Sequence, residues 1–386
     1  MRSFVVISFA FFQFLTLTLP SGSFEILKLF AFALFFIALV VNAFHGKLLV
    51  SRISLFSYEY VLFSVVFAWT VLNYRQVSDG GSLILARSII LTVTCLLSGV
   101  VLVRNRMVSA EWNNVLFVYS ICFYLGVKIF LTLAIFFGVS EDLFSQYLVD
   151  LTSTGSLGAP GLNRYVFTND FAIPFAVLAS QKSGLKGLRL ISIQFFLAIG
   201  GILTLTRYIW ICLALVLIYA LGWARVIFMI VVGLLFLLYV QANADISLLN
   251  AFEARVGEEG AGSVGEKLRQ AQILWGEFIE YFWFGKGLGS FVDWYVRNDR
   301  LSYGYEVFWL LLLMNFGFLV SVGYVFSFVA LIVARYFDCV GKRGFWDWLI
   351  FILVYLMSGF FNPAVLGPIS AFIILAIYTS TVEDHG

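Results

Sequence analysis

Residues 253–270 read EARVGEEGAGSVGEKLRQ, and they lie in the only long polar segment of an otherwise apolar chain. This segment runs from about Gln241 to Glu306 and ends in Tyr303-Gly304-Tyr305-Glu306, where the next apolar run begins. The remaining sequence indicates what kind of protein has a single long polar segment between apolar runs. Its basic residues are Arg255, Lys267, Arg269, Lys286, Arg297 and Arg300.

The composition indicates a membrane protein. The chain has 386 residues, of which 62% are hydrophobic and 12% charged, and its mean hydropathy is +0.98. Soluble domains carry about 25% charged residues, so lipid must take the place of water around most of this chain. The net charge of +2 is scattered without a basic–aromatic stripe, and nucleic acid is excluded as a partner.

Apolar runs long enough to cross about 30 Å of hydrocarbon predict about twelve transmembrane helices. The runs are continuous rather than alternating, which favours helices over a barrel. We therefore predict an all-α polytopic membrane protein. The first run lacks a small-x-small cleavage site and is expected to be a retained helix rather than a signal peptide. The predicted spans are about 4–20, 24–43, 56–73, 83–103, 113–138, 166–181, 188–206, 208–223, 225–241, 306–334, 345–361 and 363–381.

Basic residues in the short loops predict the orientation, with both termini on the cytoplasmic side. The short outside loops then hold Arg75 and Arg164, and two long segments, about 139–165 and 241–306, lie outside. Three parts follow: helices in 1–240, a large outside loop in 241–305, and helices in 306–386. The predicted inside basic residues are Arg2, Lys47, Arg52, Arg104, Arg106, Lys182, Lys186, Arg189, Arg225, Arg335, Lys342 and Arg343.

The few cysteines and histidines indicate neither a disulfide nor a metal site. Cys95, Cys122 and Cys212 fall in apolar runs, and Cys339 falls in a predicted inside loop. No cluster of histidine, cysteine and carboxylate has metal-ligand spacing. We expect a protein without a metal or another cofactor, although a site made of carboxylates alone stays open.

The large loop contains a predicted amphipathic helix over about 264–282. Ser263-Val264-Gly265-Glu266 has the pattern of a capping box, and glycines from Gly285 onward end the helix. Three interpretations stay open: a helix lying on the membrane, a lid over a cavity, and a surface helix that only packs against the bundle. Its apolar face comprises Leu268, Ala271, Trp275, Phe278 and Phe282.

Four arginines on the outside are candidates for binding an anionic group of a lipid-linked substrate, because a guanidinium grips phosphate with two hydrogen bonds. Arg207 is the sharpest, since it stands between two apolar spans, where snorkelling to the interface is the alternative role. Arg164 precedes a span, and Arg255 and Arg269 lie in the large loop. Lys128 lies within a span and needs a partner or a cavity.

Glu306 is the carboxylate at the mouth of the span that follows the large loop. A carboxylate there can act as a base toward a sugar hydroxyl or orient it. Pairing with an arginine, or stabilising a helix N-terminus, is the structural alternative.

Four stretches of the sequence resemble the O-antigen polymerase and ligase superfamily of bacterial inner membranes. An arginine followed by an "N-x-x-A" helix start matches 164–172, and an "LT-x-(S/T)-R" corner matches 203–207. An "R…W…FGxGLGxF" stretch matches Arg269, Trp275 and 284–291. A "(H/Y)-(N/E)…LL…x-x-G" segment matches 305–317.

This resemblance implies a metal-independent glycosyltransferase of the membrane-embedded, GT-C-like class with a large periplasmic loop. Its donor would be a growing glycan on undecaprenyl pyrophosphate, and its acceptor a lipid-linked repeat unit. The catalytic candidates are then Arg207, Glu306 and Arg164. The substrate-binding candidates are Arg255, Arg269, Tyr303 and Tyr305. The active site would face the periplasm, and a chain-length regulator protein is a further candidate partner.

One departure separates the two branches of the superfamily. Ligases have a histidine at the start of the span after the large loop, where this chain has Tyr305-Glu306. The departure favours a polymerase over a ligase. A lipid-linked oligosaccharide flippase or another twelve-span transporter is the alternative from a different class, and such proteins show paired halves, short loops and charges deep in the bundle.

Overall fold

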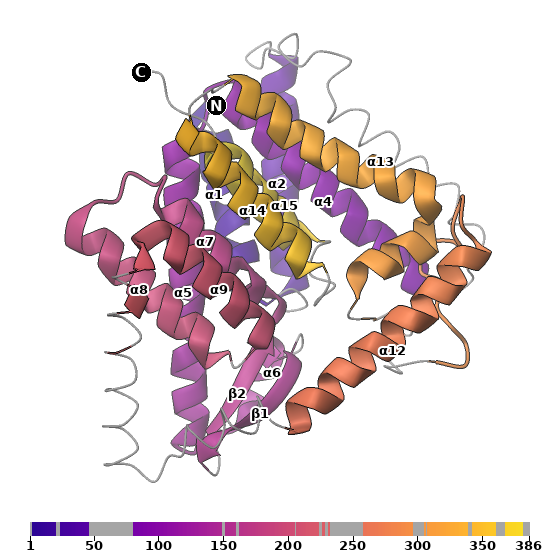
Figure 1. Cartoon of the computed structure of the whole chain (residues 1–386). Coiled ribbons are helices and arrows are strands. Elements are labelled where there is room, and N and C mark those ends of the chain that lie inside the picture. Colours follow the sequence, from indigo (N-terminus) through magenta and orange to yellow (C-terminus); the bar gives the residue numbers. More distant parts are fainter. Residues whose placement is uncertain are drawn as a thin grey trace. The chain divides into compact units, whose positions relative to one another are not determined.

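The computed structural model is mostly helical and consists of two compact units, 1–47 with 107–261 and 48–106 with 262–386. Figure 1 shows its helices and its one hairpin of strands. The described residues are 2–20, 24–45, 80–148, 151–159, 162–204, 206–223, 226–227, 231, 258–295, 305, 307–338, 342–359 and 367–380.

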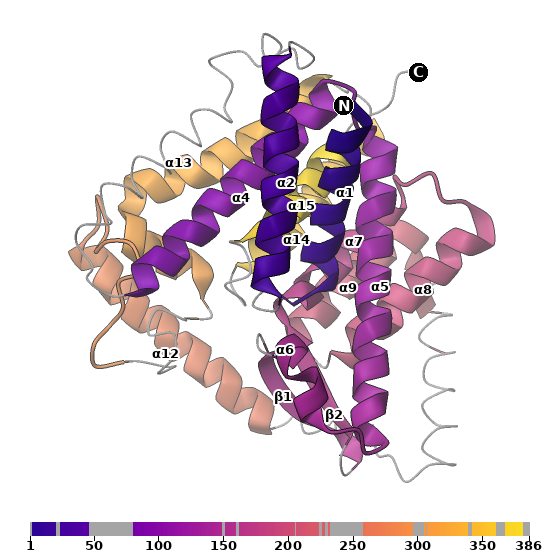
Figure 2. The same ribbon diagram turned by 180° about the vertical axis from the view of Figure 1, so that it is seen from behind.

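Three long helices form one side of the first unit. Helices α1 (Arg2–Thr18), α2 (Glu25–Phe44) and α5 (Ala110–Phe136) form where three apolar helices were predicted, and Figure 2 shows them side by side. Rings join α1 to α2, as Phe9 lies 5.3 Å from Phe35. Ser109 caps α5 by accepting the backbone N–H of Trp112 at 3.1 Å.

A β-hairpin follows α5 and corrects the expectation of an all-α chain. After η2 (Glu141–Phe144) and α6 (Ser145–Leu148), β1 (Leu151–Ala159) pairs antiparallel with β2 (Leu162–Phe167). The sequence of β1, LTSTGSLGA, is rich in serine, threonine and glycine. Such residues form helices poorly, which explains why the predicted loop at 139–165 contains strands.

The predicted span over 166–181 is wrong. Its first part belongs to β2 and to the short 3-10 helix η3 (Thr168–Ala172), and only α7 (Ile173–Ser180) is α-helical. Eight helical residues extend about 12 Å, far less than the hydrocarbon thickness. Asn169 and Asp170 explain the break, because such side chains compete for the backbone bonds of a helix, and Pro174 favours a helix start at α7.

Helices α8 (Gly187–Leu203) and α9 (Arg207–Leu221) follow in the first unit, where two further apolar helices were predicted. Two adjacent glycines allow close packing of α8. A Cβ on Gly200 would lie 2.5 Å from the Leu125 side chain of α5, and one on Gly201 would lie 2.8 Å from Leu213 of α9.

The second unit contains α4 (Gly80–Arg104), α12 (mainly in this unit, Glu258–Glu280), α13 (Phe308–Asp338), α14 (Lys342–Ser358) and α15 (Pro368–Ser380). α4 and α15 pack closely, with Gly99 against Leu375. Arg104 of α4 also donates to the hydroxyl of Tyr378 at 3.2 Å. The structure thus confirms the helices that were predicted at the positions of α4, α13, α14 and α15.

The helix predicted in the large loop is present, but its predicted start is wrong. α12 begins at Glu258, five residues before Ser263, so the capping-box pattern lies inside the helix.

Three described helices are long and apolar enough to cross a membrane: Glu25–Phe44, Arg87–Arg104 and Ala110–Phe136. Six shorter apolar helices accompany them in the described part of the chain. The helices are therefore compatible with a membrane protein. The predicted span 56–73 and most of 225–241 lie outside the described residues, and the number of twelve stays a prediction.

Candidate functional site

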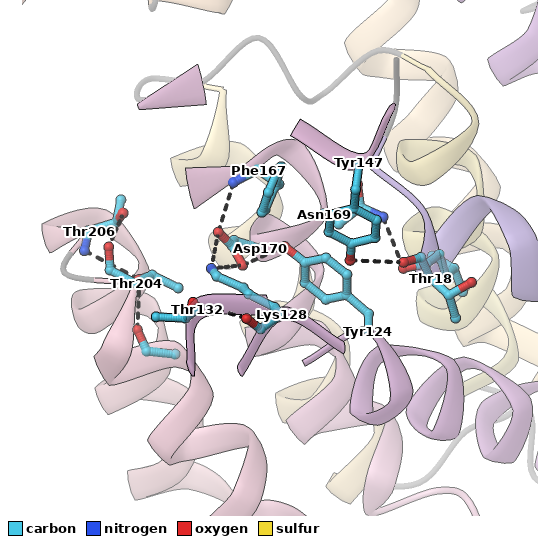
Figure 3. A network of polar contacts seen from close by, with 12 residues as sticks. Thr18, Tyr124, Lys128, Thr132, Tyr147, Phe167, Asn169, Asp170, Thr204 and Thr206 are labelled. Carbon is cyan, nitrogen blue, oxygen red and sulfur yellow. Dashed lines mark hydrogen bonds and ion pairs between the residues drawn. The ribbon is translucent and has the colours of Figure 1, made fainter. Parts of the chain in front are cut away.

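A buried ion pair lies between α5 and η3 in the first unit (Figure 3). The Lys128 ammonium donates to both carboxylate oxygens of Asp170, each at 2.7 Å. The hydroxyl of Tyr124 donates to the same carboxylate at 2.8 Å, and the backbone N–H of Phe167 donates to it at 3.0 Å. The Asp170 side chain is fully buried, so its charge depends on these donors. Lys128, for which the sequence left a structural or a site role open, therefore has a structural partner.

Asn169, the residue before Asp170, holds the end of α1. Its side-chain N–H group donates to the carbonyls of Thr16, Leu17 and Leu19 at 3.3, 2.9 and 3.1 Å. Lys28 also donates to the Leu19 carbonyl, at 3.1 Å. Carbonyls at the end of a helix have no partner within it, so Asn169 supplies bonds that α1 cannot make itself. Asn169 and Asp170 together fasten η3 to α1 and α5.

The residue that follows the predicted corner at 203–207 contacts this segment. The rings of Phe171 in η3 and Tyr208 in α9 stack at 5.4 Å. The Thr204 hydroxyl donates to the Gly201 carbonyl at 2.7 Å and accepts the Thr206 N–H at 3.3 Å, which shapes the turn between α8 and α9 (Figure 3). The corner therefore leads directly into a residue that contacts the stretch 164–172.

The two arginines of these stretches lie on regular elements, Arg207 at the start of α9 and Arg164 within β2. Arg207 is the first residue of α9 and is half-buried. Arg164 lies on β2, where its backbone pairs with Gly155 of β1. A helix N-terminus carries partial positive charge, so the backbone at Arg207 adds to the guanidinium's attraction for an anion.

The other two stretches meet in the second unit. A loop after α12 packs against a kink in α13 at Gly317, and the backbone N–H groups of Lys286 and Gly287 donate to the carbonyls of Met314 and Asn315 at 2.7 and 3.1 Å. The Asn315 side chain accepts the N–H of Ser290 at 3.0 Å. The glycine-rich stretch 284–291 is therefore held by the segment 314–317.

Tyr305 fixes the end of this loop from within. The ring is fully buried and stacks on Tyr295 at 6.2 Å. Its hydroxyl accepts the N–H of Val292 at 2.9 Å and donates to the Tyr295 carbonyl at 3.1 Å, and burial raises its pKa. With its hydroxyl bound on both sides, Tyr305 positions the loop rather than presenting a free group to a substrate.

Arg269 lies exposed on α12 and contacts the Tyr295 ring of this aromatic pair. Its guanidinium carbon is 5.5 Å from the ring centre of Tyr295, a distance typical of a cation–π contact. The Tyr295 hydroxyl donates to Glu266. Burial, followed by this hydrogen bond and the charge of Glu266, raises the pKa of Tyr295 to about 12. Arg269 is thus held in place while its guanidinium stays open to solvent.

A second cation of this loop is already paired. Lys286 donates to Glu277 of α12 at 2.7 Å and lies 5.9 Å from the ring centre of Tyr281. Burial lowers the pKa of Lys286, but the hydrogen bond to Glu277 and that carboxylate's charge outweigh burial and raise it. The pair joins the start of the glycine-rich stretch to the last turns of α12.

The structure brings some of the predicted site residues near common neighbours and does not describe others. Arg164 and Arg207 belong to contacting segments of the first unit, and Arg269 and Tyr305 both contact Tyr295 in the second. Arg255, Tyr303 and Glu306 lie outside the described residues. Their predicted roles stay predictions.

Sequence reasoning missed Asn169, Asp170 and Tyr295. A signal for Asp170 was present, because a lysine inside a predicted span requires a buried carboxylate, and Asp170 was the acidic residue placed inside a neighbouring apolar run. Comparisons of the chain with protein-family models, curated proteins and solved structures find no match.

Proposed function

We propose that this protein is an O-antigen-type polysaccharide polymerase of a bacterial inner membrane. It would transfer a growing glycan from undecaprenyl pyrophosphate to a lipid-linked repeat unit on the periplasmic side. The finer architecture, with about twelve spans, a GT-C-like arrangement and both termini in the cytoplasm, belongs to the same proposal.

One observation carries the proposal. The four stretches that resemble the superfamily are scattered over about 150 residues of sequence, yet two of them lie close together within each unit. In the first unit Phe171 stacks on Tyr208, the residue that follows 203–207, and in the second Lys286 and Gly287 bond to Met314 and Asn315. Such contacts within a unit are expected if the two stretches of a pair act together.

The proposed reaction needs charge stabilisation more than it needs a reactive side chain. A hydroxyl oxygen of the acceptor sugar forms a bond to the anomeric carbon of the donor. The bond from that carbon to the pyrophosphate oxygen breaks, and the electron pair leaves with undecaprenyl pyrophosphate. The hydroxyl proton passes to Glu306 or to the departing pyrophosphate.

Arginines suit the leaving group. The guanidinium of Arg207 would bind a phosphate with two hydrogen bonds, next to the N-terminus of α9. Arg164 and Arg255 or Arg269 would contact the pyrophosphate or the glycan. Fixed positive charge at a leaving group stabilises the transition state, because the negative charge grows as the bond breaks.

A reconstituted assay tests the proposal. Purified protein in detergent receives lipid-linked repeat units and no nucleotide sugar, and the products are separated by gel electrophoresis. We expect a ladder of longer lipid-linked glycans. Adding a chain-length regulator would change the length distribution without being needed for the first transfer.

The same assay separates the alternatives. Units that cross liposome leaflets without being extended would identify a flippase, and transfer only to a lipid A core acceptor would identify a ligase. The flippase alternative loses its one sequence argument, the charge of Lys128 inside a span, because Asp170 neutralises that charge within the unit.

A further inference from the structure

The C-terminal half of α12 exposes apolar side chains along one side. Leu268, Trp275 and Ile279 are spaced by seven and four residues and are 61%, 50% and 53% exposed. The turn continues beyond the helix, since the N–H of Gly285 donates to the Tyr281 carbonyl at 2.8 Å, and Trp283 continues the row at 57%. We call these four residues the α12 stripe.

The α12 stripe is separate from the face by which α12 packs. Leu274 and Phe278 are buried in the second unit, and only Phe278 of these two belongs to the apolar face that the sequence predicted. Arg269 and Glu280 are exposed on the other border of the stripe, whereas Gln272 lies in line with the stripe, seven residues before Ile279. The helix thus has a packed face, an apolar exposed side and a polar exposed side, which is the pattern of a helix at a boundary between two solvents.

The stripe continues onto a helix that is itself a predicted span. The ring of Trp283 lies edge-on to Phe318 of α13 at 6.5 Å, and Phe282 stacks on Phe318 at 5.2 Å. Past Phe318, α13 exposes Leu319 and Val322 on the apolar segment Phe308–Gly323. An apolar helix of a membrane protein exposes such residues to lipid, so the same lipid reaches Trp283.

We infer that the α12 stripe lies in the interfacial layer of the bilayer, with Trp275, Ile279 and Trp283 among the headgroups and upper acyl chains. Two of its four residues are tryptophan, the side chain enriched at membrane–water interfaces. If the stripe faced water instead, a row of large apolar side chains would be exposed to solvent beside a helix that faces lipid, which is unfavourable. Among the three roles open from the sequence, this selects a helix lying on the membrane. The inference depends on the membrane character of the chain and not on the proposed polymerase activity.

The arrangement anchors the loop that follows. Lys286 and Gly287 come directly after the stripe, and both are bonded to α13. Lipid contact along α12 would therefore hold the glycine-rich stretch at the membrane surface, at the depth where the headgroup of a lipid-linked substrate lies.

Spin-label accessibility tests the inference. Single-cysteine variants Trp275→Cys and Ile279→Cys, and the matched controls Arg269→Cys and Glu280→Cys, are made in full-length protein in which Cys95, Cys122, Cys212 and Cys339 are replaced. Each is labelled with a nitroxide in lipid nanodiscs, and its collisions with oxygen and with a water-soluble nickel chelate are measured. Monodisperse elution in detergent shows that each variant is folded. Because each side of the helix has two labelled positions, the comparison can still be made if one variant fails to fold.

We expect an oxygen-to-nickel collision ratio several-fold higher at 275 and 279 than at 269 and 280. Equal ratios at the four positions would place the stripe in water and overturn the inference. Shielding of 275 and 279 from both reagents would show that protein, such as a second copy, covers the stripe, and this would overturn it as well. No readout depends on glycan transfer, so failure of the polymerase proposal would leave this result unchanged.

Discussion

Gly285 and Gly317 approach each other so closely that a Cβ on Gly317 would lie 2.4 Å from the backbone nitrogen of Gly285. In the other direction, a Cβ on Gly285 would lie 2.3 Å from the Asn315 carbonyl oxygen. Gly317 has φ 70° and ψ 179°, a conformation that is essentially limited to glycine. Both the space and the backbone angles therefore require glycine where the loop after α12 meets the kink of α13.

Gly317→Ala should destabilise the second unit by about 2–4 kcal/mol, from backbone strain and overpacking together. The measurement is reversible unfolding by SDS titration in mixed micelles. Gly323→Ala is the matched control in the same helix, since nothing lies within 4 Å of its added Cβ. There we expect no loss, or a gain of about 0.5–1 kcal/mol from better helix propensity. Equal effects of the two changes would contradict the close approach.

Replacing Asp170 by Asn should cost about 3–5 kcal/mol, because it leaves the Lys128 ammonium buried without its counter-charge. Lys128→Met should cost a similar amount by isolating the carboxylate. The double variant removes both charges, so its loss should be smaller than the sum of the single losses. The same SDS titration gives this double-mutant cycle, and strictly additive losses would mean that the pair makes no net coupling.

Tyr305→Phe should destabilise the loop by about 1–3 kcal/mol, since the buried N–H of Val292 loses its acceptor. The readout is the thermal unfolding midpoint in detergent. Tyr281→Phe serves as the control, because its ring is 39% exposed and surface changes usually stay within about 0.5 kcal/mol. A Tyr305→Phe protein as stable as the control would show that another group satisfies Val292.

Arg207→Ala should reduce glycan chain growth by about 10²–10³-fold, the usual effect of removing one stabilising donor at developing charge. Arg207→Lys should recover little of this, because an ammonium cannot form the paired hydrogen bonds of a guanidinium. Ladder intensity in the reconstituted assay, at matched protein amounts, measures both. Arg189→Ala, an exposed change on α8, is expected to leave the ladder unchanged. Near-normal ladders from both Arg207 variants would make Arg207 a membrane anchor only.

Hydropathy and period predicted the long helices well, because those features depend on local composition. The helices α1, α2, α4 and α5 end within a few residues of the predicted spans. The failure at 166–181 has a different origin. Its residues are apolar enough for a span. The side chains of Asn169 and Asp170, however, form hydrogen bonds to α1 and α5, which lie far away in sequence. Hydropathy alone cannot predict such long-range hydrogen bonds, and it therefore predicted a span here.

The candidate site divides in the same way. Short sequence patterns located the stretches around Arg207 and Gly285, because glycine and arginine are recognisable residues at fixed positions of these patterns. They did not show which stretches touch, because the contact of Gly285 with Gly317 depends on a kink, and that of Phe171 with Tyr208 depends on how helices pack. Tyr305 was predicted to contact the substrate because it precedes Glu306. In the structure its ring is fully buried and its hydroxyl holds the loop.

The bond of Asn169 to the end of α1 has a consequence for the time course of synthesis. Leu19 and Asn169 are separated by 150 residues, and ribosomes add about 5–20 residues per second. The carbonyls that end the first helix therefore wait roughly 8–30 s for their final donor. During that interval α1 is complete but lacks its donor, so the first helix made is fixed at its end only when the chain has reached Asn169.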